Sequence, residues 1–253
     1  MKITLFLAGE SPLTTVEWDY PTTINAWVYK ILNRADPVWG DQGHRTRGRA
    51  VRPFSISPLD FPVPAVVTPA GLVPQSGAAV LTIGTVDAAL ARALETYAAD
   101  EILVFGDTGY RVDAVVVDPV KVEGDSVMGM LSSPIVIARR DAQGSRIFLP
   151  PRHPDFWVLV QQNLAHKARQ FFDGDGNADD VTVATTGTWR RKMTRFDGHP
   201  VIGWITASPL TITGPRTVCE AALTFGLGAY NAHGFGTLRL VESSHDEEEW
   251  AAF

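Results

Sequence analysis

The sequence predicts an α+β protein made of two tandem ferredoxin-like domains, each with the element order β-α-β-β-α-β. Three observations support this fold. The length of 253 residues suits two domains of about 100–150 residues each. A hydrophobic fraction of 45% can fill a core, which excludes a disordered or low-complexity chain. Strand-like and helix-like hydrophobic patterns also follow one another in a similar order in both halves.

In the N-terminal half, residues 2–8 alternate in hydrophobicity and predict a first strand. Apolar residues from Ile24 to Ile31 recur at helical spacing, which predicts a helix over 22–34 that Asp36-Pro37 closes. The later elements are expected as strands at 51–57, 79–84 and 111–123 and a helix at 87–99 with Thr85 as its N-cap. Residues 60–74 form a Pro-rich connector within this half.

A similar order begins again after residue 124, so the expected domains are 1–124 and 125–241, followed by an acidic tail at 242–253. Residues 153–172 give the longest helical pattern of the chain. The other expected elements are strands at 127–137, 146–149, 181–186, 189–194, 201–206 and 235–241 and a helix at 216–225. The two halves share the order of elements without a visible sequence repeat.

The net charge of −6 hides a clustered distribution of basic residues. Five acidic residues lie in the tail, so the rest of the chain is close to neutral. Twelve of the 22 basic residues fall in three short windows: Arg45, Arg47, Arg49 and Arg52; Arg139, Arg140, Arg146 and Arg152; and Arg190, Arg191, Lys192 and Arg195. Such clusters create a phosphate-binding field, although solvated turns and edge strands are an equally good interpretation of the clustering alone.

The composition also limits the compartment and the cofactors. No run approaches the ~18 apolar residues of a membrane helix, and residues 1–9 fit a strand better than a signal peptide. The single cysteine, Cys219, excludes a disulfide framework and a cysteine-rich zinc site. We therefore expect a cytoplasmic protein with no membrane association, no metal and no cofactor.

The segment at residues 226–236 predicts a ligand-binding loop between the last helix and the last strand. Four glycines and Asn231 lie within eleven residues: Gly226, Gly228, Gly234 and Gly236 are the glycines expected to bind. Glycine allows positive φ and close approach of the backbone to a ligand, and successive backbone N–H groups can hold a phosphate. A merely tight turn between helix and strand is the alternative.

A basic loop at residues 43–57 predicts a second functional site. His44 lies there among Arg45, Arg47, Arg49 and Arg52, and Tyr29 lies on the preceding helix. Neighbouring arginines favour the neutral form of an imidazole, which can accept a proton. A histidine, a tyrosine and an arginine supply the proton-transfer groups and the cation that an RNA 2′-hydroxyl needs to attack its own phosphate without a metal.

Several segments carry a resemblance that runs in order from end to end of the chain. They are Trp27-Val-Tyr29-Lys-Ile-Leu with Asp36-Pro37, His44, Arg52-Pro-Phe54-Ser-Ile-Ser57, Leu131-Ser-Ser133-Pro134-Ile135-Val136 and the glycine-rich segment 226–236. Together they resemble the CRISPR-associated repeat-processing endoribonuclease family of the repeat-associated RNA-binding (RAMP) superfamily. The glycine-rich segment is shared across that superfamily, whereas the His44 and Arg52 pair is more discriminating.

The resemblance implies an enzyme that cuts precursor CRISPR RNA within the repeat and leaves 2′,3′-cyclic phosphate and 5′-hydroxyl ends without a metal. It implies His44 as general base or acid, Tyr29 as an orienting or proton-sharing group, and Arg52 as the cation that stabilises the phosphorane. Arg52 stands where some members have Lys, so Arg45, Arg47 or Arg49 could take its role. His44 itself could be a bystander.

Two other functions remain open at this point. The first is a catalytically silent RNA-binding protein, such as a subunit of a CRISPR effector complex, which the glycine loop and the basic windows fit equally well. The second is a small-molecule-binding ferredoxin-like protein, which would not need three basic windows. The expected RNA-binding residues are Arg45, Arg47, Arg49, Arg139, Arg140, Arg190, Arg191 and Lys192, with the four glycines above. A homodimer is also possible.

Overall fold

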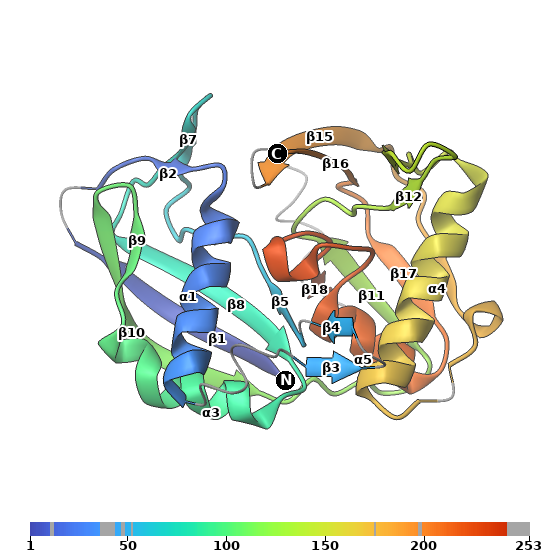
Figure 1. Ribbon diagram of the computed structural model, residues 1–253, viewed down its shortest axis with the longest axis horizontal. Helices are drawn as coiled ribbons and strands as arrows, with labels where there is room; N and C mark the ends of the chain where they lie inside the picture. The colour runs from blue at the N-terminus through green and yellow to red at the C-terminus, as the bar shows by residue number, and fades with distance from the viewer. Residues whose placement is uncertain are drawn as a thin grey trace.

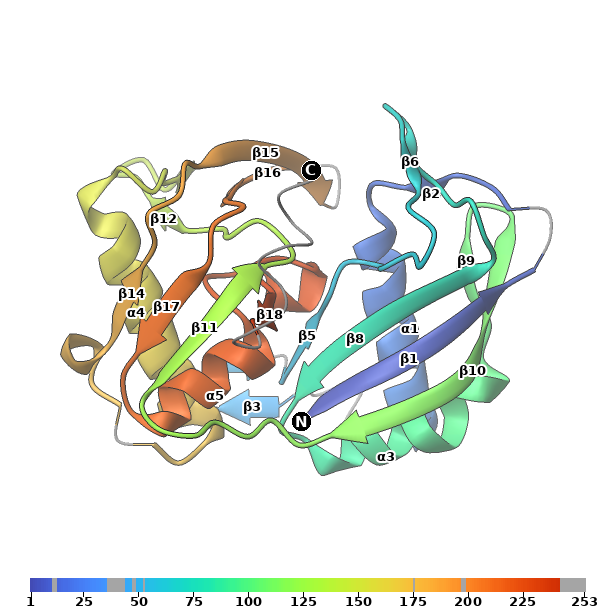
Figure 2. The same ribbon diagram turned by 180° about the vertical axis from the view of Figure 1, so that it is seen from behind.

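The structure is a computed structural model that describes residues 1–10, 13–35, 44–46, 49–51, 53–174, 176–196 and 199–241. The expected acidic tail lies outside these residues. Two antiparallel sheets stand side by side, and the main helices cover the same side of both (Figure 1). In the view from behind, the sheets face the reader (Figure 2). The chain therefore has the predicted two ferredoxin-like domains. Among the described residues, no helix is long and apolar enough to cross a membrane.

The first sheet has the strand order β5-β8-β1-β10-β9. Its elements are β1 (Lys2–Gly9), α1 (Tyr20–Ala35), β5 (Phe54–Ile56), β8 (Ala78–Thr85), α3 (Ala88–Tyr97), the 3₁₀ turn η1 (Ala98–Asp100), β9 (Leu103–Phe105) and β10 (Thr108–Asp118). Side chains alternate along β1, so that Ile3, Leu5 and Leu7 are buried in one core with α1 and α3. Lys2 and Thr4 consequently point to the opposite, helix-free face.

The second sheet repeats this arrangement with the order β14-β17-β11-β18. Its elements are β11 (Ser126–Leu131), α4 (Pro154–Phe171), the 3₁₀ turn η2 (Ala178–Asp180), β14 (Thr182–Ala184), β17 (Leu210–Thr213), α5 (Arg216–Phe225), the 3₁₀ turn η3 (Asn231–His233) and β18 (Leu238–Leu240). Phe156 and Leu164 of α4 and Cys219 of α5 are fully buried against Ile212 of this sheet. Each domain thus buries one face of its sheet under two helices.

Four smaller β-structures lie outside these sheets. They are the set β2 (Val16–Glu17), β7 (Gly71–Val73) and β6 (Val66–Val67), and the hairpins β3 (His44–Thr46) with β4 (Arg49–Val51), β12 (Ala138–Arg140) with β13 (Arg146–Phe148), and β15 (Arg190–Phe196) with β16 (His199–Ile205). The expected Pro-rich connector therefore contains two short strands, because β6 and β7 pair with each other and β7 also pairs with β2.

Several local expectations were wrong in detail. Asp87, not Thr85, caps α3, because the Asp87 carboxylate accepts hydrogen bonds from the N–H groups of Ala89 and Leu90. Thr85 Oγ1 instead donates to the carbonyl of Pro53 and accepts from the N–H of Asp87. The strand expected over 127–137 ends at Leu131. The segments expected as strands at 189–194 and 201–206 form the separate β15–β16 hairpin, and β17 takes the sheet position instead.

The two domains are joined by buried hydrogen bonds as well as by the chain. Ser55 Oγ of β5 donates to the carbonyl of Thr224 on α5 at 2.7 Å. Asn25 Nδ2 of α1 donates to the carbonyl of Ala232 in η3 at 2.8 Å. Gly84 of β8 lies so close to α5 that a Cβ there would stand 1.8 Å from the Thr224 carbonyl oxygen. The carboxyl end of α5 and the loop after it are therefore part of the domain interface.

Candidate nucleic-acid interface

A groove of about 1020 Å³ lies between the helix-free faces of the two sheets. Lys2, Thr4 and Thr82 line it from the first sheet, and Met130 and Leu240 line it from the second. Because the intervening β1 residues face the helices, the groove lies on the helix-free side of the sheets. The ribbon in Figure 2 is viewed from this side. Strands from both domains are thus required to form it.

Basic side chains outnumber acidic ones in this groove. Five basic and two acidic residues line it: Lys2, Lys121, Arg190, Lys192 and Arg239, against Asp60 and Asp118. The chain as a whole carries a net charge of −6, so the groove concentrates positive charge that the total does not reveal. Among the described residues, Lys121, Arg190 and Lys192 form no ion pair with an acidic side chain. Such a surface suits a phosphate backbone.

The β15–β16 hairpin divides its predicted RNA-binding residues between two faces. All three residues are exposed, but only Arg190 and Lys192 line the groove. Successive side chains of a strand point to opposite faces, so Arg190 and Lys192 share one face of β15 and Arg191 lies on the other. In the hairpin, Arg190 pairs with Ile205 and Lys192 pairs with Gly203. The structure therefore brings two of these three predicted residues to one surface.

Lys2, at the start of β1, lines the groove. Its Nζ donates to the carbonyl of Leu238 at 3.3 Å, which connects β1 of the first domain with β18 of the second. Burial lowers the pKa of Lys2 from its usual value. Neither Lys2 nor Lys121 was expected at this site, because isolated lysines at a strand end or between domains give no local signal in the sequence.

The glycine-rich segment is a compact, largely buried loop. Its four predicted glycines all have positive φ: Gly226 at 74°, Gly228 at 71°, Gly234 at 80° and Gly236 at 68°. Many of its N–H groups bond within the protein, as Leu227 donates to Gly236 and Gly236 donates to Pro134. Gly226 contributes to the groove lining. The close approach that these glycines allow is therefore first of all an approach to other parts of the same chain.

A buried lysine on α4 binds this loop through hydrogen bonds. Nζ of Lys167, on α4, donates to the carbonyls of Gly226 at 2.8 Å and Gly228 at 3.1 Å and to Asn231 Oδ1 at 2.8 Å. Burial lowers the pKa of Lys167 to about 7. Sequence reasoning missed this residue. The available signal was its place beside Leu164 and Ala168 on the apolar stripe of α4, where a lysine requires polar partners.

Tyr29 lies on α1, one turn after Asn25, which bonds to η3. Its ring packs edge-on against Phe54 of β5, with the ring centroids 5.7 Å apart. In the β3–β4 hairpin, His44 stands opposite Val51. The backbone thus brings His44 next to the residue that precedes Arg52, while Phe54, two residues further on, contacts Tyr29.

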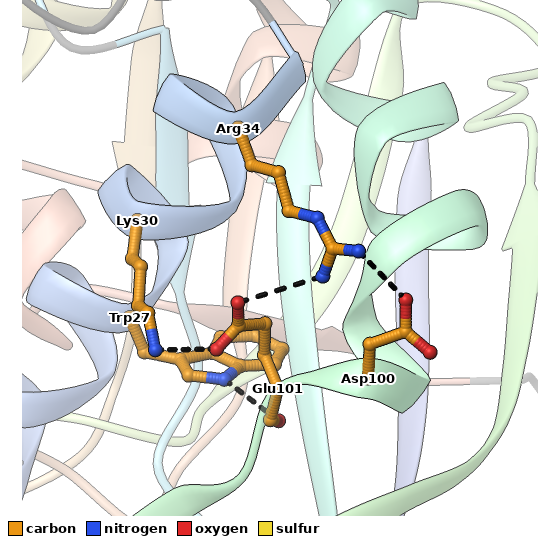
Figure 3. Close-up of polar contacts among 5 residues, drawn as sticks. All are labelled: Trp27, Lys30, Arg34, Asp100 and Glu101. Carbon is orange, nitrogen blue, oxygen red and sulfur yellow. Dashed lines mark hydrogen bonds and ion pairs between the residues drawn. The ribbon is translucent and has the colours of Figure 1, made fainter.

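A polar cluster joins α1 to the segment around η1 in the first domain (Figure 3). Glu101, which follows η1, forms ion pairs with Lys30 and with Arg34 of α1, and its backbone carbonyl accepts a hydrogen bond from Trp27 Nε1 at 3.1 Å. Arg34 also pairs with Asp100 at 3.0 Å. The hydrogen bond from Lys30 is the main cause that lowers the pKa of Glu101. This cluster holds the helix that carries Tyr29, so it helps to position that residue.

Other predicted site residues are engaged elsewhere or lie outside the described residues. Arg139 pairs with Asp155 at 2.6 Å, and Arg140 donates to the carbonyl of Gly144 in its own hairpin turn. Neither lines the groove. The backbone alone is described for His44, Arg45 and Arg49, and Arg47 and Arg52 lie outside the described residues. Within the described part of the chain, no three His, Cys, Asp or Glu side chains gather as metal ligands.

Sequence comparison finds one related family. Residues 117–240 match the family model described as CRISPR associated protein Cas6, C-terminal. No curated protein matches the chain by sequence.

Solved structures with the same fold cover nearly the whole chain. One, described as an RAMP protein binding different RNA substrates, has a TM-score of 0.80 and 16% identity and covers 96% of this chain and 100% of its own. A Cas6-related protein from Pyrococcus furiosus has a TM-score of 0.80 and 14% identity, covering 96% and 99%. A CRISPR associated protein Cas6 has a TM-score of 0.73 and 19% identity, also covering 96% and 99%. At these identities the likeness is one of fold.

Proposed function

Because this chain belongs to the Cas6 family of CRISPR repeat-processing proteins, we propose that it is an endoribonuclease that cuts precursor CRISPR RNA within the repeat. The substrate's own 2′-hydroxyl attacks the adjacent phosphorus, a 2′-O–P bond forms, and the bond from phosphorus to the 5′-oxygen breaks. A base removes the proton of the 2′-hydroxyl and an acid protonates the leaving 5′-oxygen. The products are a 2′,3′-cyclic phosphate and a 5′-hydroxyl, and no metal takes part.

The observation that carries this proposal is that one strand pairing and one ring contact link the segments of His44, Arg52 and Tyr29. The β3–β4 pairing sets His44 opposite Val51, beside Arg52 in the chain, and Phe54 contacts the Tyr29 ring. In the proposal, His44 is the general base or acid, Tyr29 orients or shares proton transfer, and Arg52 stabilises the phosphorane. One of Arg45, Arg47 and Arg49 takes the role of Arg52 if that residue is not the cation.

The basic groove is evidence that the substrate is RNA. A groove of about 1020 Å³ that five basic side chains from two domains line suits an extended polyanion. Arg190, Lys192 and Lys121 would neutralise phosphates there, and Gly226 would contact the same ligand. We propose that Arg139, Arg140, Arg191 and the remaining glycines assist at the margins. The proposed division of the chain near residue 124 falls between β10 and β11, which belong to different sheets.

The decisive experiment is cleavage of end-labelled repeat RNA by the purified protein in EDTA. We expect a single cut whose 5′ product carries a cyclic phosphate, and replacement of the attacking 2′-hydroxyl by hydrogen should abolish cleavage while binding persists. His44→Ala should slow single-turnover cleavage by about 10²–10⁴-fold with nearly unchanged RNA affinity. His166→Ala, at an exposed position of α4, is the matched control and should cleave normally.

Other results would contradict parts of this proposal. An unchanged cleavage rate in His44→Ala would remove that residue from the mechanism. A stable complex with repeat RNA and no cleavage would mean a silent RNA-binding subunit. Absence of both binding and cleavage would leave the small-molecule function. Effector-complex subunits and a homodimeric partner stay predictions that size measurements with and without RNA would test.

A further inference from the structure

The groove described above has more positive charge than its own residues compensate. Five basic and two acidic side chains line it, and Lys121, Arg190 and Lys192 form no ion pair with an acidic side chain within the described residues. Cations that line one groove repel one another. A polyanion in the groove would relieve this repulsion, whether it is RNA or part of the protein.

The last described strand delivers the chain into this groove. Arg239 and Leu240 of β18 are lining residues, and the N–H of Val241 donates to the carbonyl of Met128 at 3.1 Å. The last described residues of the second sheet therefore lie at the groove wall. Residues 242–253 follow, and they include Glu242, Asp246, Glu247, Glu248 and Glu249.

The length of this segment suits the distance that it would have to cover. An extended chain of twelve residues spans up to about 40 Å, so the four acidic residues at 246–249 can reach the groove without being fully extended. A segment tethered this close has an effective concentration in the millimolar range. Exposed ion pairs are individually weak. The four carboxylates at 246–249 would therefore be displaced by a ligand that carries more negative charges.

We propose that residues 242–253 bind within this groove through their acidic side chains and compete there with RNA. This inference rests on the proposed role of the groove in RNA binding. The tail then acts as an internal competitor. A long, highly charged RNA displaces it, whereas a weakly bound polyanion does not. Its effect falls as salt increases, because mobile ions screen both contacts.

Zero-length carbodiimide cross-linking tests the docking itself in the absence of RNA. The reagent joins carboxylates to amines in contact, so mass spectrometry should find residues 246–249 joined to Lys2, Lys121 or Lys192. The ion pair between Lys30 and Glu101 is an internal control that must cross-link in every sample. Adding repeat RNA should remove the tail cross-links and leave the control intact. Absence of tail cross-links beside a normal control would overturn the proposal.

A binding measurement tests the competition. The variant D246N/E247Q/E248Q/E249Q should bind repeat RNA about fivefold more tightly at low salt if the tail occupies the groove in most molecules. This difference in affinity should vanish at high salt. The matched control neutralises four exposed acids outside the groove: E17Q, D19N, E95Q and D107N. Equal gains in both variants would mean general repulsion and would refute a specific competitor.

The two experiments separate this inference from the proposed function. Tail cross-links that RNA does not displace would retain the docking but refute the competition and the RNA-binding role of the groove. A protein that binds and cuts repeat RNA but shows no tail cross-link would retain the proposed nuclease and refute the tail as its competitor.

Discussion

Lys167 Nζ on α4 lies 2.8 Å from Asn231 Oδ1 in the glycine-rich loop, and the same ammonium donates to the carbonyls of Gly226 and Gly228. Asn231 Nδ2 in turn donates to the carbonyls of Leu227 and Phe235. One buried lysine and one asparagine thus connect both ends of the loop to the second domain. The next residue, Ala232, accepts the hydrogen bond from Asn25 of the first domain.

Replacing Lys167 should weaken folding and change its pH dependence. Lys167→Met leaves three buried acceptors without their donor, which should cost on the order of 3 kcal/mol. Because the lysine pKa is about 7 in the fold against 10.5 as its usual value, the unfolded chain holds an extra proton between these pH values. Raising the pH from 7 to 9 should therefore stabilise the wild-type protein relative to Lys167→Met. Urea unfolding at pH 7, 8 and 9 measures this, and parallel curves would contradict it.

Two glycines of the loop should respond very differently to alanine. A Cβ on Gly236 would stand 1.9 Å from the Leu227 carbonyl oxygen, whereas one on Gly234 meets nothing nearer than Pro21 at 3.4 Å. Gly236→Ala should therefore fail to fold stably. Gly234→Ala should cost about 1 kcal/mol for its positive φ and should also bind repeat RNA more weakly, because η3 shifts against α1. Melting temperature and RNA affinity decide this together: normal binding by folded Gly234→Ala would make the loop purely structural.

Salt dependence should separate the two faces of the β15–β16 hairpin. Arg190→Ala with Lys192→Ala removes two cations from the groove, so the slope of log affinity against log salt should fall by about 1–2. Arg191→Ala, on the same strand but off the groove, removes one cation at the margin and should lower the slope less than the double variant does. Because phosphates carry no sequence information, the weakening should be equal for repeat and unrelated RNA. A changed sequence preference would argue that these residues read bases.

Glu101 should stabilise α1 in a pH-dependent way. Its carboxylate pairs with Lys30 and Arg34, and the hydrogen bond from Lys30 leads the causes that lower its pKa. The stabilisation is present above the usual pKa of 4.5 and disappears as the pH falls through the lowered value. Glu101→Gln should therefore melt at a lower temperature at pH 7, and the difference should shrink in acid. Glu95→Gln, exposed on α3, should melt like the wild type at both pH values.

The sequence by itself determined the order of elements and the segments that carry the family resemblance. Periodicity placed α1, α4 and α5 because a helix that covers a sheet repeats its apolar residues every three to four positions. The glycine spacing at 226–236 predicted a loop with positive φ, which the structure confirms. These features depend on residues close together in the chain, so a local pattern is enough to find them.

Only the tertiary structure decided which strands pair and which charges meet. Alternation shows that a strand has two faces but not which neighbour it joins, and for this reason β17 was missed in favour of the β15–β16 hairpin. Lys2 and Arg239 meet in one groove although 237 positions separate them in the sequence, and Lys167 finds its acceptors about 60 residues away. Contacts at such separations arise from the packing of two sheets and leave no periodic trace in the chain.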